Sequence, residues 1–406
     1  MQWLLYPPEQ NIYYHCAGSI CMQPDITVLG AGVNGTSTAL ALTLLGYNTQ
    51  IVADQFAYEE QHRDPRFSSA YGAGAILPYS VGMDSLDETF EESQTVFRLL
   101  EELSVLGVRK NDHYWIDEEG RGPSNAPKYL DGFRKVESPN ALPRRTGSEH
   151  VTDFTAEMLF ADMPTYMEGL YRLYQAAGGS IRKRTVTRTD LTEMPGLLIN
   201  CTGLRSPELF EDSAPYHAAR GHLVTAQRAP IPKLDGTMIS YSYSVAGDRK
   251  GVYCFPRMDG IVMGGTHQSV PYRPDEKPCF PPLNEPTTKI GGTEVPKRIV
   301  ELNAELLAQL GVDVERSDLE VSIGYRPLRD PEGDGVRVEL AEESCGPVVH
   351  NYGHGGAGIS VSWGCAISVA RLVREAIGDR EVPPAPVSRP APLLPLYRTL
   401  TKHICE

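Results

Sequence analysis

The segment ITVLGAGVNG, residues 26–35, decides the fold of this chain. Its first four residues form an apolar, β-branched run that is typical of a buried parallel strand. The next six residues form a GxGxxG pattern. Gly30 permits the tight turn, Gly32 lets backbone N–H groups approach an anion, and Gly35 lets the following helix pack on the sheet. The segment therefore predicts a dinucleotide-binding turn.

The residues that follow complete the unit that such a turn requires. Residues 33–45 are predicted to form a helix and residues 49–53 a second strand. Val33 and Asn34 begin the helix, whose N-terminus carries the partial positive charge that favours a pyrophosphate. Asp54 ends the second strand, where a carboxylate can accept hydrogen bonds from ribose hydroxyls. This motif alone does not distinguish NAD from FAD, so an NAD-dependent dehydrogenase is an alternative at this point.

Apolar periodicity outlines the remainder of the chain. It predicts further helices over residues 88–106, 167–177, 299–310 and 362–377, and buried strands over residues 197–200 and 347–350. Alternating residues between 217 and 270 predict antiparallel strands. The prolines between 271 and 296 predict a long surface loop, and those after Gly378 predict an extended tail.

The predicted fold class is α/β, with a Rossmann-like dinucleotide-binding domain interrupted by a second, α+β domain whose sheet is mainly antiparallel. The first domain is assigned to residues 25–80, 160–210 and 320–377, and the second, substrate domain to residues 81–159 and 211–319. Residues 1–24 are an N-terminal extension, and residues 378–406 a proline-rich tail.

Composition excludes several classes of protein. The chain has 406 residues and a formal net charge of −14, which argues against a nucleic-acid partner because phosphate binding needs a basic face. It contains no long apolar run, so no membrane span is expected. Its eight cysteines form no CxxC pair and no metal site is expected. Without a basic leader followed by an apolar core, or a C-terminal peroxisomal tripeptide, a cytoplasmic location is expected.

Several further segments carry a family resemblance. They are SSAYGAGA (68–75), NCTG (200–203), GYRP (324–327), HNYGHGGAGIS (350–360) and WGCA (363–366). Taken in this order, they resemble the D-amino-acid oxidase family of FAD flavoenzymes, which includes D-aspartate oxidase. The resemblance extends from about residue 25 to residue 375, and residues 107–150 and 271–296 match poorly.

The resemblance implies FAD as the cofactor and a set of residues that hold it. Beyond Gly30, Gly32, Val33, Asn34, Gly35 and Asp54, that set comprises Gly72, Ala73, Gly74, Val186, Thr202, Gly203, Gly355, Gly356, Ala357, Gly358, Ile359 and Ser360. The helix predicted to begin near Ser362 then points its N-terminal dipole toward the flavin. His350 and His354 are interpreted as structural hydrogen-bonding residues rather than metal ligands.

The resemblance also implies how a substrate is held. Arg326 matches the family arginine that binds the substrate carboxylate, for which a planar guanidinium suits better than lysine. Tyr253 matches a tyrosine whose hydroxyl touches the same carboxylate; an aromatic residue packed in the core is the alternative for this position. Arg337 is a weaker candidate that supports the site through hydrogen bonds.

Three positions depart from the family pattern. Arg249 stands where mammalian D-amino-acid oxidases have a second tyrosine, so that contact is either absent or supplied by Tyr241 or Tyr243. Ala357 replaces a tyrosine, which is expected to open space beside the flavin. His267 stands where D-aspartate oxidases have an arginine, and it is either a contact for a polar or acidic substrate side chain or a rim residue without a role.

The reaction implied is oxidation of a neutral or polar D-amino acid to an imino acid, which hydrolyses to a 2-oxo acid and ammonia. Dioxygen is reduced to hydrogen peroxide, and no side chain need act as a base. Three alternatives are a D-aspartate-type oxidase, a tailoring oxidase of one unusual amino acid or cyclic amine, and a flavin-binding protein without oxidase activity. The expected partners are a small amino acid and dioxygen, and a homo-oligomer is compatible with the sequence.

Overall fold

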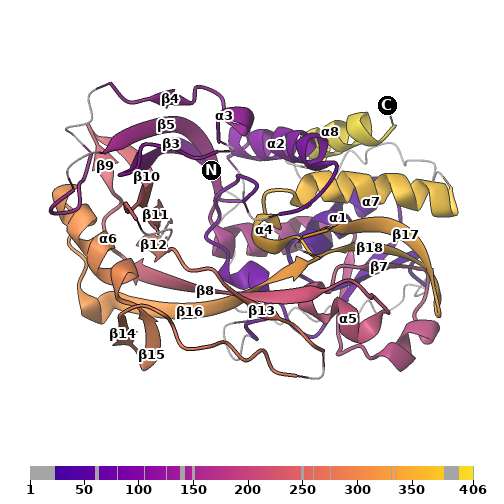
Figure 1. The fold of residues 1–406 in the computed structure, drawn as a ribbon. Coiled ribbons are helices and arrows are strands. Elements are labelled where there is room, and N and C mark those ends of the chain that lie inside the picture. The colour runs from indigo at the N-terminus through magenta and orange to yellow at the C-terminus, as the bar shows by residue number, and fades with distance from the viewer. Residues whose placement is uncertain are drawn as a thin grey trace.

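The computed structural model describes residues 23–405 apart from 60–63, 80, 105, 125, 138–141, 149–150, 248–250, 259, 275, 331, 334 and 379–392. Two sheets with helices around them make up most of this part of the chain (Figure 1). Residues 1–22 of the predicted N-terminal extension, Arg249, and residues 379–392 of the predicted tail lie outside the described residues.

The first sheet contains the dinucleotide-binding unit. Its strand order is β17-β18-β7-β1-β2-β6, and all neighbours are parallel except β17 and β18. The bounds are β1 Ile26–Leu29, β2 Thr49–Ala53, β6 Ser180–Lys183, β7 Leu197–Asn200, β17 Arg337–Glu343 and β18 Gly346–Tyr352. The central strands β1 and β7 are buried on both faces, as their continuous apolar runs predict. The strands predicted at 26–29, 49–53, 197–200 and 347–350 are therefore confirmed.

Helices cover this sheet and form the largest core with it (Figure 1). They are α1 Val33–Leu44, α2 Leu86–Glu102, α4 Met163–Ala176, α7 Ser362–Ile377 and α8 Leu393–Cys405. Helix α1 contacts α4 and α7, and α7 contacts β17 and β18. Helix α4 begins at Met163, earlier than the predicted residue 167, because the Asp162 side chain accepts a hydrogen bond from the Thr165 N–H and caps the helix.

The second sheet is mainly antiparallel. Its path runs β13-β8-β12-β11-β10-β3-β5-β4, with β16 paired to β8 and β9 to β10, and only β3 and β10 run parallel. The bounds are β3 Val108–Asp117, β4 Arg134–Lys135, β5 Thr152–Ala161, β8 Tyr216–Gln227, β9 Lys233–Leu234, β10 Thr237–Ser244, β11 Val252–Pro256, β12 Gly260–Gly264, β13 Gln268–Pro271 and β16 Leu319–Arg329. Helix α6, Lys297–Gln309, packs on β11 and β12, and the short helices α3 (Ala126–Tyr129) and α5 (Ser206–Leu209) lie in connections. The predicted fold class is confirmed.

The long loop predicted over 271–296 is wrong at its C-terminal end. There, β14 (Thr287–Ile290) and β15 (Thr293–Pro296) form an antiparallel hairpin. The two residues between them, Gly291 and Gly292, both have positive φ, at 53° and 82°. A two-residue turn of this kind matches the right-handed twist of the paired strands, and glycine adopts it without steric cost. The number of prolines in the segment concealed this turn signal.

The extended tail predicted after Gly378 is wrong for residues 393–405, which form α8. Leu393, Leu396, Leu400 and Ile404 recur at helical spacing and are buried against the first core. Arg371 of α7 donates a hydrogen bond to the His403 carbonyl near the C-terminus of α8. The proline-rich composition before residue 393 hid a short amphipathic helix.

Strand β16 crosses the predicted domain boundary at residue 320. It pairs with β8 along its full length, so Arg326 lies on the second sheet, although the residues that follow β16 return to the first sheet. The division of the chain into two domains remains a prediction. The pairing of β16 with β8 bears on it, because β16 extends beyond the predicted end of the second domain.

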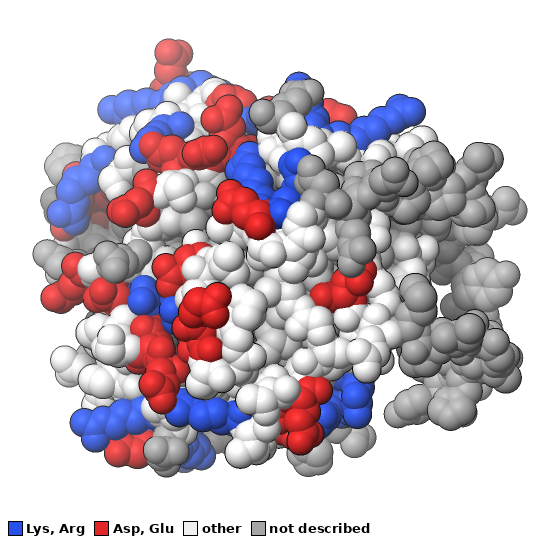
Figure 2. Space-filling view, turned by 90° about the vertical axis from the view of Figure 1, so that its right-hand side faces the viewer, with Lys and Arg blue, Asp and Glu red and all other residues white. Residues whose placement is uncertain are grey.

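Two observations concern the surface and the helices of the described residues. On the face shown in Figure 2, acidic and basic side chains of the described residues are interspersed, unlike the continuous basic face that nucleic-acid binding needs. Within the described part of the chain, we find no helix that combines the length and apolar character needed to cross a membrane.

Candidate active site

A cavity of about 410 Å³ extends from the glycine turn after β1 to the second sheet. Its lining includes Gly30 and Asp54 from the first sheet and Tyr253 and Arg326 from the second. A volume of this size lies within the range of small-molecule and cofactor sites. Segments far apart in the sequence thus enclose one continuous space.

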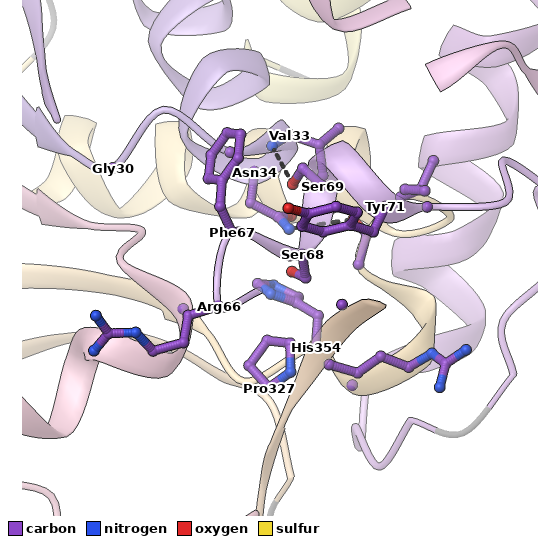
Figure 3. Close-up of a pocket in the computed structure, with 18 of the residues that line it drawn as sticks. Gly30, Val33, Asn34, Arg66, Phe67, Ser68, Ser69, Tyr71, Pro327 and His354 are labelled. Atoms are coloured by element: carbon purple, nitrogen blue, oxygen red, sulfur yellow. Dashed lines mark hydrogen bonds between the residues drawn. The ribbon is translucent and has the colours of Figure 1, made fainter. Parts of the chain in front are cut away.

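Glycine is required at the turn that closes one end of the cavity. Gly30 has φ +100°, and a Cβ placed there would lie 2.5 Å from the Cys201 carbonyl oxygen. A Cβ on Gly35 would collide with the Gly30 carbonyl oxygen, so this glycine packs α1 against the turn and lies outside the cavity lining. The backbone N–H of Val33 donates to Ser69 Oγ at 2.9 Å (Figure 3). The turn and the 68–75 segment are therefore joined at the N-terminus of α1.

An ion pair marks the end of β2. The Asp54 carboxylate lies 3.1 Å from Arg205 Nη1, and Arg205 also donates to the Val186 carbonyl at 3.3 Å. Asp54, Val186 and Arg205 all line the cavity, as do Thr202 and Gly203 after β7. These residues lie beyond the carboxyl ends of β2, β6 and β7, where open α/β sheets bind nucleotides.

The middle of the cavity is formed by the 66–74 and 353–359 segments. Figure 3 shows Phe67, Tyr71 and His354 gathered between the turn at Gly30 and the strand that carries Pro327. His354 Nε2 lies 2.9 Å from Asn351 Oδ1, and complete burial lowers the pKa of His354 to about 3. The His354 imidazole is therefore neutral and makes a hydrogen bond within the protein, which is the role predicted for it. It also lines the cavity.

At the far end, Arg326 and Tyr253 line the same space. Arg326 Nη1 donates to the Thr266 carbonyl at 3.2 Å. Burial raises the pKa of the Tyr253 hydroxyl, and the nearby Arg326 charge acts in the opposite direction. Tyr253 stacks on Phe255 with ring centroids 4.5 Å apart. A protonated hydroxyl and a guanidinium thus face one site.

Three glycines on the cavity face of the second sheet make room for the side chains above them. A Cβ on Gly221 would lie 2.8 Å from Arg326 Nη2, and one on Gly324 would lie 2.7 Å from the Tyr71 Cβ. Gly264 stands opposite Tyr253 in the β11–β12 register, and a Cβ there would overlap the tyrosine ring. We call Gly221, Gly264 and Gly324 the glycine floor, because the functional side chains rest on their bare backbone.

The structure separates several of the predicted site residues from the cavity. Gly35, Ala357 and Ser360 lie outside its lining. Ala357 is buried in a small cluster with Val361 and Cys365, so its small side chain does not widen this cavity. Ser360 instead donates to the Leu77 carbonyl at 3.0 Å.

The remaining predicted cofactor residues line the cavity. They are Gly72, Ala73, Gly74, Gly355, Gly356, Gly358 and Ile359, together with Gly30, Gly32, Val33 and Asn34.

Neither tyrosine considered as a substitute at Arg249 reaches the site. The Tyr241 hydroxyl donates to Asn303 Oδ1 at 2.9 Å, and the Tyr243 hydroxyl donates to Glu118 Oε1 at 2.8 Å. Both side chains lie on the face of β10 that packs away from the cavity, since neighbouring residues of a strand alternate between faces.

Arg337 does not line the cavity but contacts a residue that does. It donates to the Tyr352 hydroxyl at 3.1 Å and pairs with Glu339 at 2.6 Å. Tyr352 lines the cavity and Arg337 does not, which agrees with a supporting role through hydrogen bonds.

Residues that the sequence did not single out also shape the cavity. Leu77, Tyr79, His222, Ser242 and Phe255 all line it. The positions of His222, Ser242 and Phe255 depend on which strands of the second sheet are neighbours, and no local motif marks any of the five residues. Strand alternation predicts that Ser242 and Tyr253 share a face of the sheet only if the β10–β11 register is already known.

The lining fits FAD. Asn34 lines the cavity, its Nδ2 donates to the Gly358 carbonyl at 3.2 Å, and its buried Oδ1 has no hydrogen-bond partner within the described chain. The N-terminus of α1 and the Asp54 carboxylate supply the polar ends that a dinucleotide needs. The glycine-rich 353–358 segment lets the backbone approach a flat ring.

A parallel sheet with this glycine turn defines a dinucleotide-binding protein, and one cavity joins the turn to an arginine–tyrosine pair on the second sheet. The family model described as DAO, FAD dependent oxidoreductase, matches residues 25–372. The chain therefore belongs to the DAO family of FAD-dependent oxidoreductases, and the alternative of an NAD-dependent dehydrogenase is excluded.

Named relatives agree with this assignment. The chain is 30% identical over 362 residues to a D-amino-acid oxidase of Rubrobacter xylanophilus, covering 86% of this chain and 96% of the relative. It is 26% identical over 378 residues to a D-aspartate oxidase of Homo sapiens, covering 88% of this chain and 97% of the relative. The solved structure of glycine oxidase from Geobacillus kaustophilus superposes with a TM-score of 0.63 at 16% identity, covering 91% of this chain and 99% of that one. This last likeness shows the fold.

Proposed function

We propose that the protein oxidises D-amino acids to imino acids, which hydrolyse to 2-oxo acids and ammonia, while dioxygen is reduced to hydrogen peroxide. The observation that carries this proposal is the pairing of Arg326 and Tyr253 over the glycine floor, in the same cavity as the glycine turn. The names of the relatives, D-amino-acid oxidase and D-aspartate oxidase, support an amino-acid substrate of D configuration.

In this proposal Arg326 binds the substrate α-carboxylate through two parallel N–H donors, the geometry that a planar guanidinium provides. Tyr253 donates a third hydrogen bond, since its raised pKa keeps the hydroxyl protonated at neutral pH. The two groups fix the position and rotation of the carboxylate, so the α-carbon is held in one orientation toward the cofactor end of the cavity.

Catalysis then rests on this orientation. FAD, when bound, supplies the two-electron oxidation and the reaction with dioxygen. The substrate amine must be neutral when the α-hydrogen leaves, and the burial of the site favours the neutral amine over the ammonium form. We therefore assign no side chain as the base.

The proposal is tested with the purified, FAD-loaded protein and a panel of D- and L-amino acids. We expect bleaching of the flavin absorbance without air, and peroxide release in air, with D-amino acids only. If light reduces the flavin and air reoxidises it, but no amino acid reduces it, the protein is a flavin protein with another substrate. Equal turnover of both enantiomers would contradict the assigned stereochemistry.

Gly264→Ala is expected to raise KM by about 10- to 100-fold, because the added methyl displaces the Tyr253 ring from the carboxylate, and small displacements of binding groups have effects of this order. The measurement is steady-state oxidation of D-alanine. Adding Gly264→Ala to Tyr253→Ala should then cost little more than Tyr253→Ala alone, since the ring that the methyl strikes is already gone. Additive losses would show that Gly264 acts independently of Tyr253.

Two sequence features that favoured a specialised substrate lie away from the cavity in the structure. Ala357 lies away from the cavity, and the 271–296 segment contains the β14–β15 hairpin and contributes no residue to the cavity among those described. These positions favour an oxidase of ordinary D-amino acids over one of a single unusual substrate.

A D-aspartate-type reading depends on His267. Burial, followed by the positive charge of Arg326, lowers the pKa of His267 below its usual 6.5. The imidazole is therefore neutral at pH 7 to 8 and offers no fixed positive charge to a second carboxylate. This observation supports a preference for neutral side chains over aspartate.

His267→Arg is expected to raise kcat/KM for D-aspartate relative to D-asparagine by about 10-fold, because a charge-assisted bond to the side-chain carboxylate replaces a neutral one. In the wild type, that ratio should stay flat above pH 6.5 and rise as the pH falls through the lowered pKa of His267, where the imidazole gains its proton. His217→Arg, at a histidine outside the cavity lining, is the matched control. A ratio unchanged by His267→Arg would assign His267 to the rim.

A further inference from the structure

The cavity continues past Tyr253 onto the neighbouring strand β10. Ser242 stands directly opposite Tyr253 in the β10–β11 register, and it is the residue of β10 that lines the cavity. Directly opposed residues on one face of a sheet have Cβ atoms about 5 Å apart. Arg326 is on β16, at the other side of Tyr253 in the sheet order β16-β8-β12-β11-β10. A substrate whose carboxylate is bound by Arg326 and Tyr253 therefore has Ser242 within reach of its side chain.

A buried chain of hydrogen bonds holds the Ser242 hydroxyl. His113 Nε2 lies 3.1 Å from Ser242 Oγ, and His113 Nδ1 lies 2.8 Å from Ser240 Oγ. Asn111 Nδ2 donates to the same Ser240 Oγ at 3.0 Å. His113 also packs edge-on against Trp115 with ring centroids 4.4 Å apart. The imidazole thus has a fixed position behind the cavity wall.

The hydrogen-bond partners in this chain favour one direction for its protons. Complete burial lowers the pKa of His113 to about 3, so the ring is neutral and has one donor and one acceptor nitrogen. The Ser240 hydroxyl has two acceptors in reach, His113 Nδ1 at 2.8 Å and the Asp112 carbonyl at 3.4 Å. The shorter bond favours the tautomer in which Nδ1 accepts from Ser240 and Nε2–H donates to Ser242. The Ser242 hydroxyl proton is then left to point into the cavity.

Apolar and aromatic residues line the cavity together with Ser242. Leu77, Tyr79, Leu223 and Phe255 line the cavity, and Leu77, Leu223 and Phe255 belong to one hydrophobic cluster. A carboxylate on the substrate side chain would lose its hydration here for neutral hydroxyl donors, those of Ser242 and Tyr79, which do not compensate a buried charge. A neutral oxygen needs only one such donor.

We propose that Ser242 determines substrate specificity by donating a hydrogen bond to a neutral acceptor oxygen, an amide carbonyl or a hydroxyl, on the side chain of the D-amino acid. His113 is the positioning residue that fixes the Ser242 hydroxyl. This inference rests on the proposed function, because it assigns the side-chain end of the same site.

The experiment compares substrates of nearly equal shape in the FAD-loaded protein. D-asparagine and D-leucine form one pair, and D-threonine and D-valine form another. Ser242→Ala should lower kcat/KM for D-asparagine and D-threonine by about 3- to 10-fold, the usual effect of one neutral hydrogen bond, and leave D-leucine and D-valine within about 2-fold. Ser244→Ala, on the same strand but outside the cavity lining, should change neither pair.

Variants of His113 test its positioning role. His113→Phe should lower the ratio of D-asparagine to D-leucine as Ser242→Ala does, and combining the two should lower it no further. His113→Gln keeps an N–H donor and should restore part of the ratio. Ratios taken within one variant are independent of the fraction of protein that folds, so a loss of stability does not imitate the effect.

The outcomes separate this inference from the proposed function. Turnover of D-amino acids with substrate ratios that Ser242→Ala leaves unchanged overturns the role of Ser242 alone. A ratio lowered by Ser242→Ala but unaffected by His113→Phe overturns the positioning role of His113. Wild-type protein whose flavin no D-amino acid reduces overturns the proposed function, and this inference with it.

Discussion

Arg326→Ala is expected to lower kcat/KM for D-amino acids by about 10²- to 10³-fold while the flavin absorbance spectrum stays that of the wild type. The reason is that the α-carboxylate would enter a buried site with its charge unpaired, and removing one partner of such a hydrogen-bonded charge pair costs about 2–5 kcal/mol. The guanidinium makes one hydrogen bond to the protein, to the Thr266 carbonyl, among the bonds described, so its truncation leaves the fold in place.

Two further variants sharpen this prediction. Arg326→Lys keeps the charge and loses the planar pair of donors, so it should recover only part of the activity. Arg220→Ala removes an arginine from the neighbouring strand that lies outside the cavity lining, and it should leave kcat/KM within a few-fold of the wild type. Steady-state kinetics with D-alanine measures all three. An Arg326→Ala protein with unchanged KM and kcat would place the carboxylate site elsewhere.

Gly30→Ala is expected to abolish FAD binding or to weaken it by more than about 100-fold, because the new Cβ would lie 2.5 Å from the Cys201 carbonyl at the turn. Gly178→Ala is a matched control. Gly178 has nearly the same backbone angle, φ +105° against +100° for Gly30, and a Cβ there meets nothing within 4 Å. The control carries only the conformational cost of a positive φ, about 1–2 kcal/mol of unfolding free energy.

Flavin fluorescence quenching by the apoprotein measures this affinity, and thermal unfolding measures the stability of each variant. Gly32→Ala keeps the measurement informative if Gly30→Ala does not fold. Gly32 has φ −70°, which alanine adopts, and a Cβ there approaches Ser69 Oγ to 3.1 Å on the cavity side. We expect a folded Gly32→Ala protein with weakened FAD binding. FAD affinity unchanged in both Gly30→Ala and Gly32→Ala would show that this turn does not hold the cofactor.

Local signals were sufficient for the dinucleotide-binding unit. The run at residues 26–29, the glycines that follow and the helix over 33–44 are neighbours in the sequence, and their conformations are set by sterics and burial within about 30 residues. The hairpin at 287–296 and helix α8 also had local signals, a Gly-Gly turn and a helical leucine spacing. Prolines nearby led to the wrong prediction in both cases.

The sequence by itself determined the strands β1, β2, β7 and β18 of the first sheet, the glycine turn, and the resemblance from which Arg326 and Tyr253 were predicted. Only the tertiary structure showed the glycine floor, the position of Ser242 over His113, and the exclusion of Ala357 from the cavity. The physical reason is the strand register of the second sheet. Neighbouring strands there come from distant parts of the chain, and a shift of one residue turns every side chain to the opposite face, so no local pattern states which side chains meet.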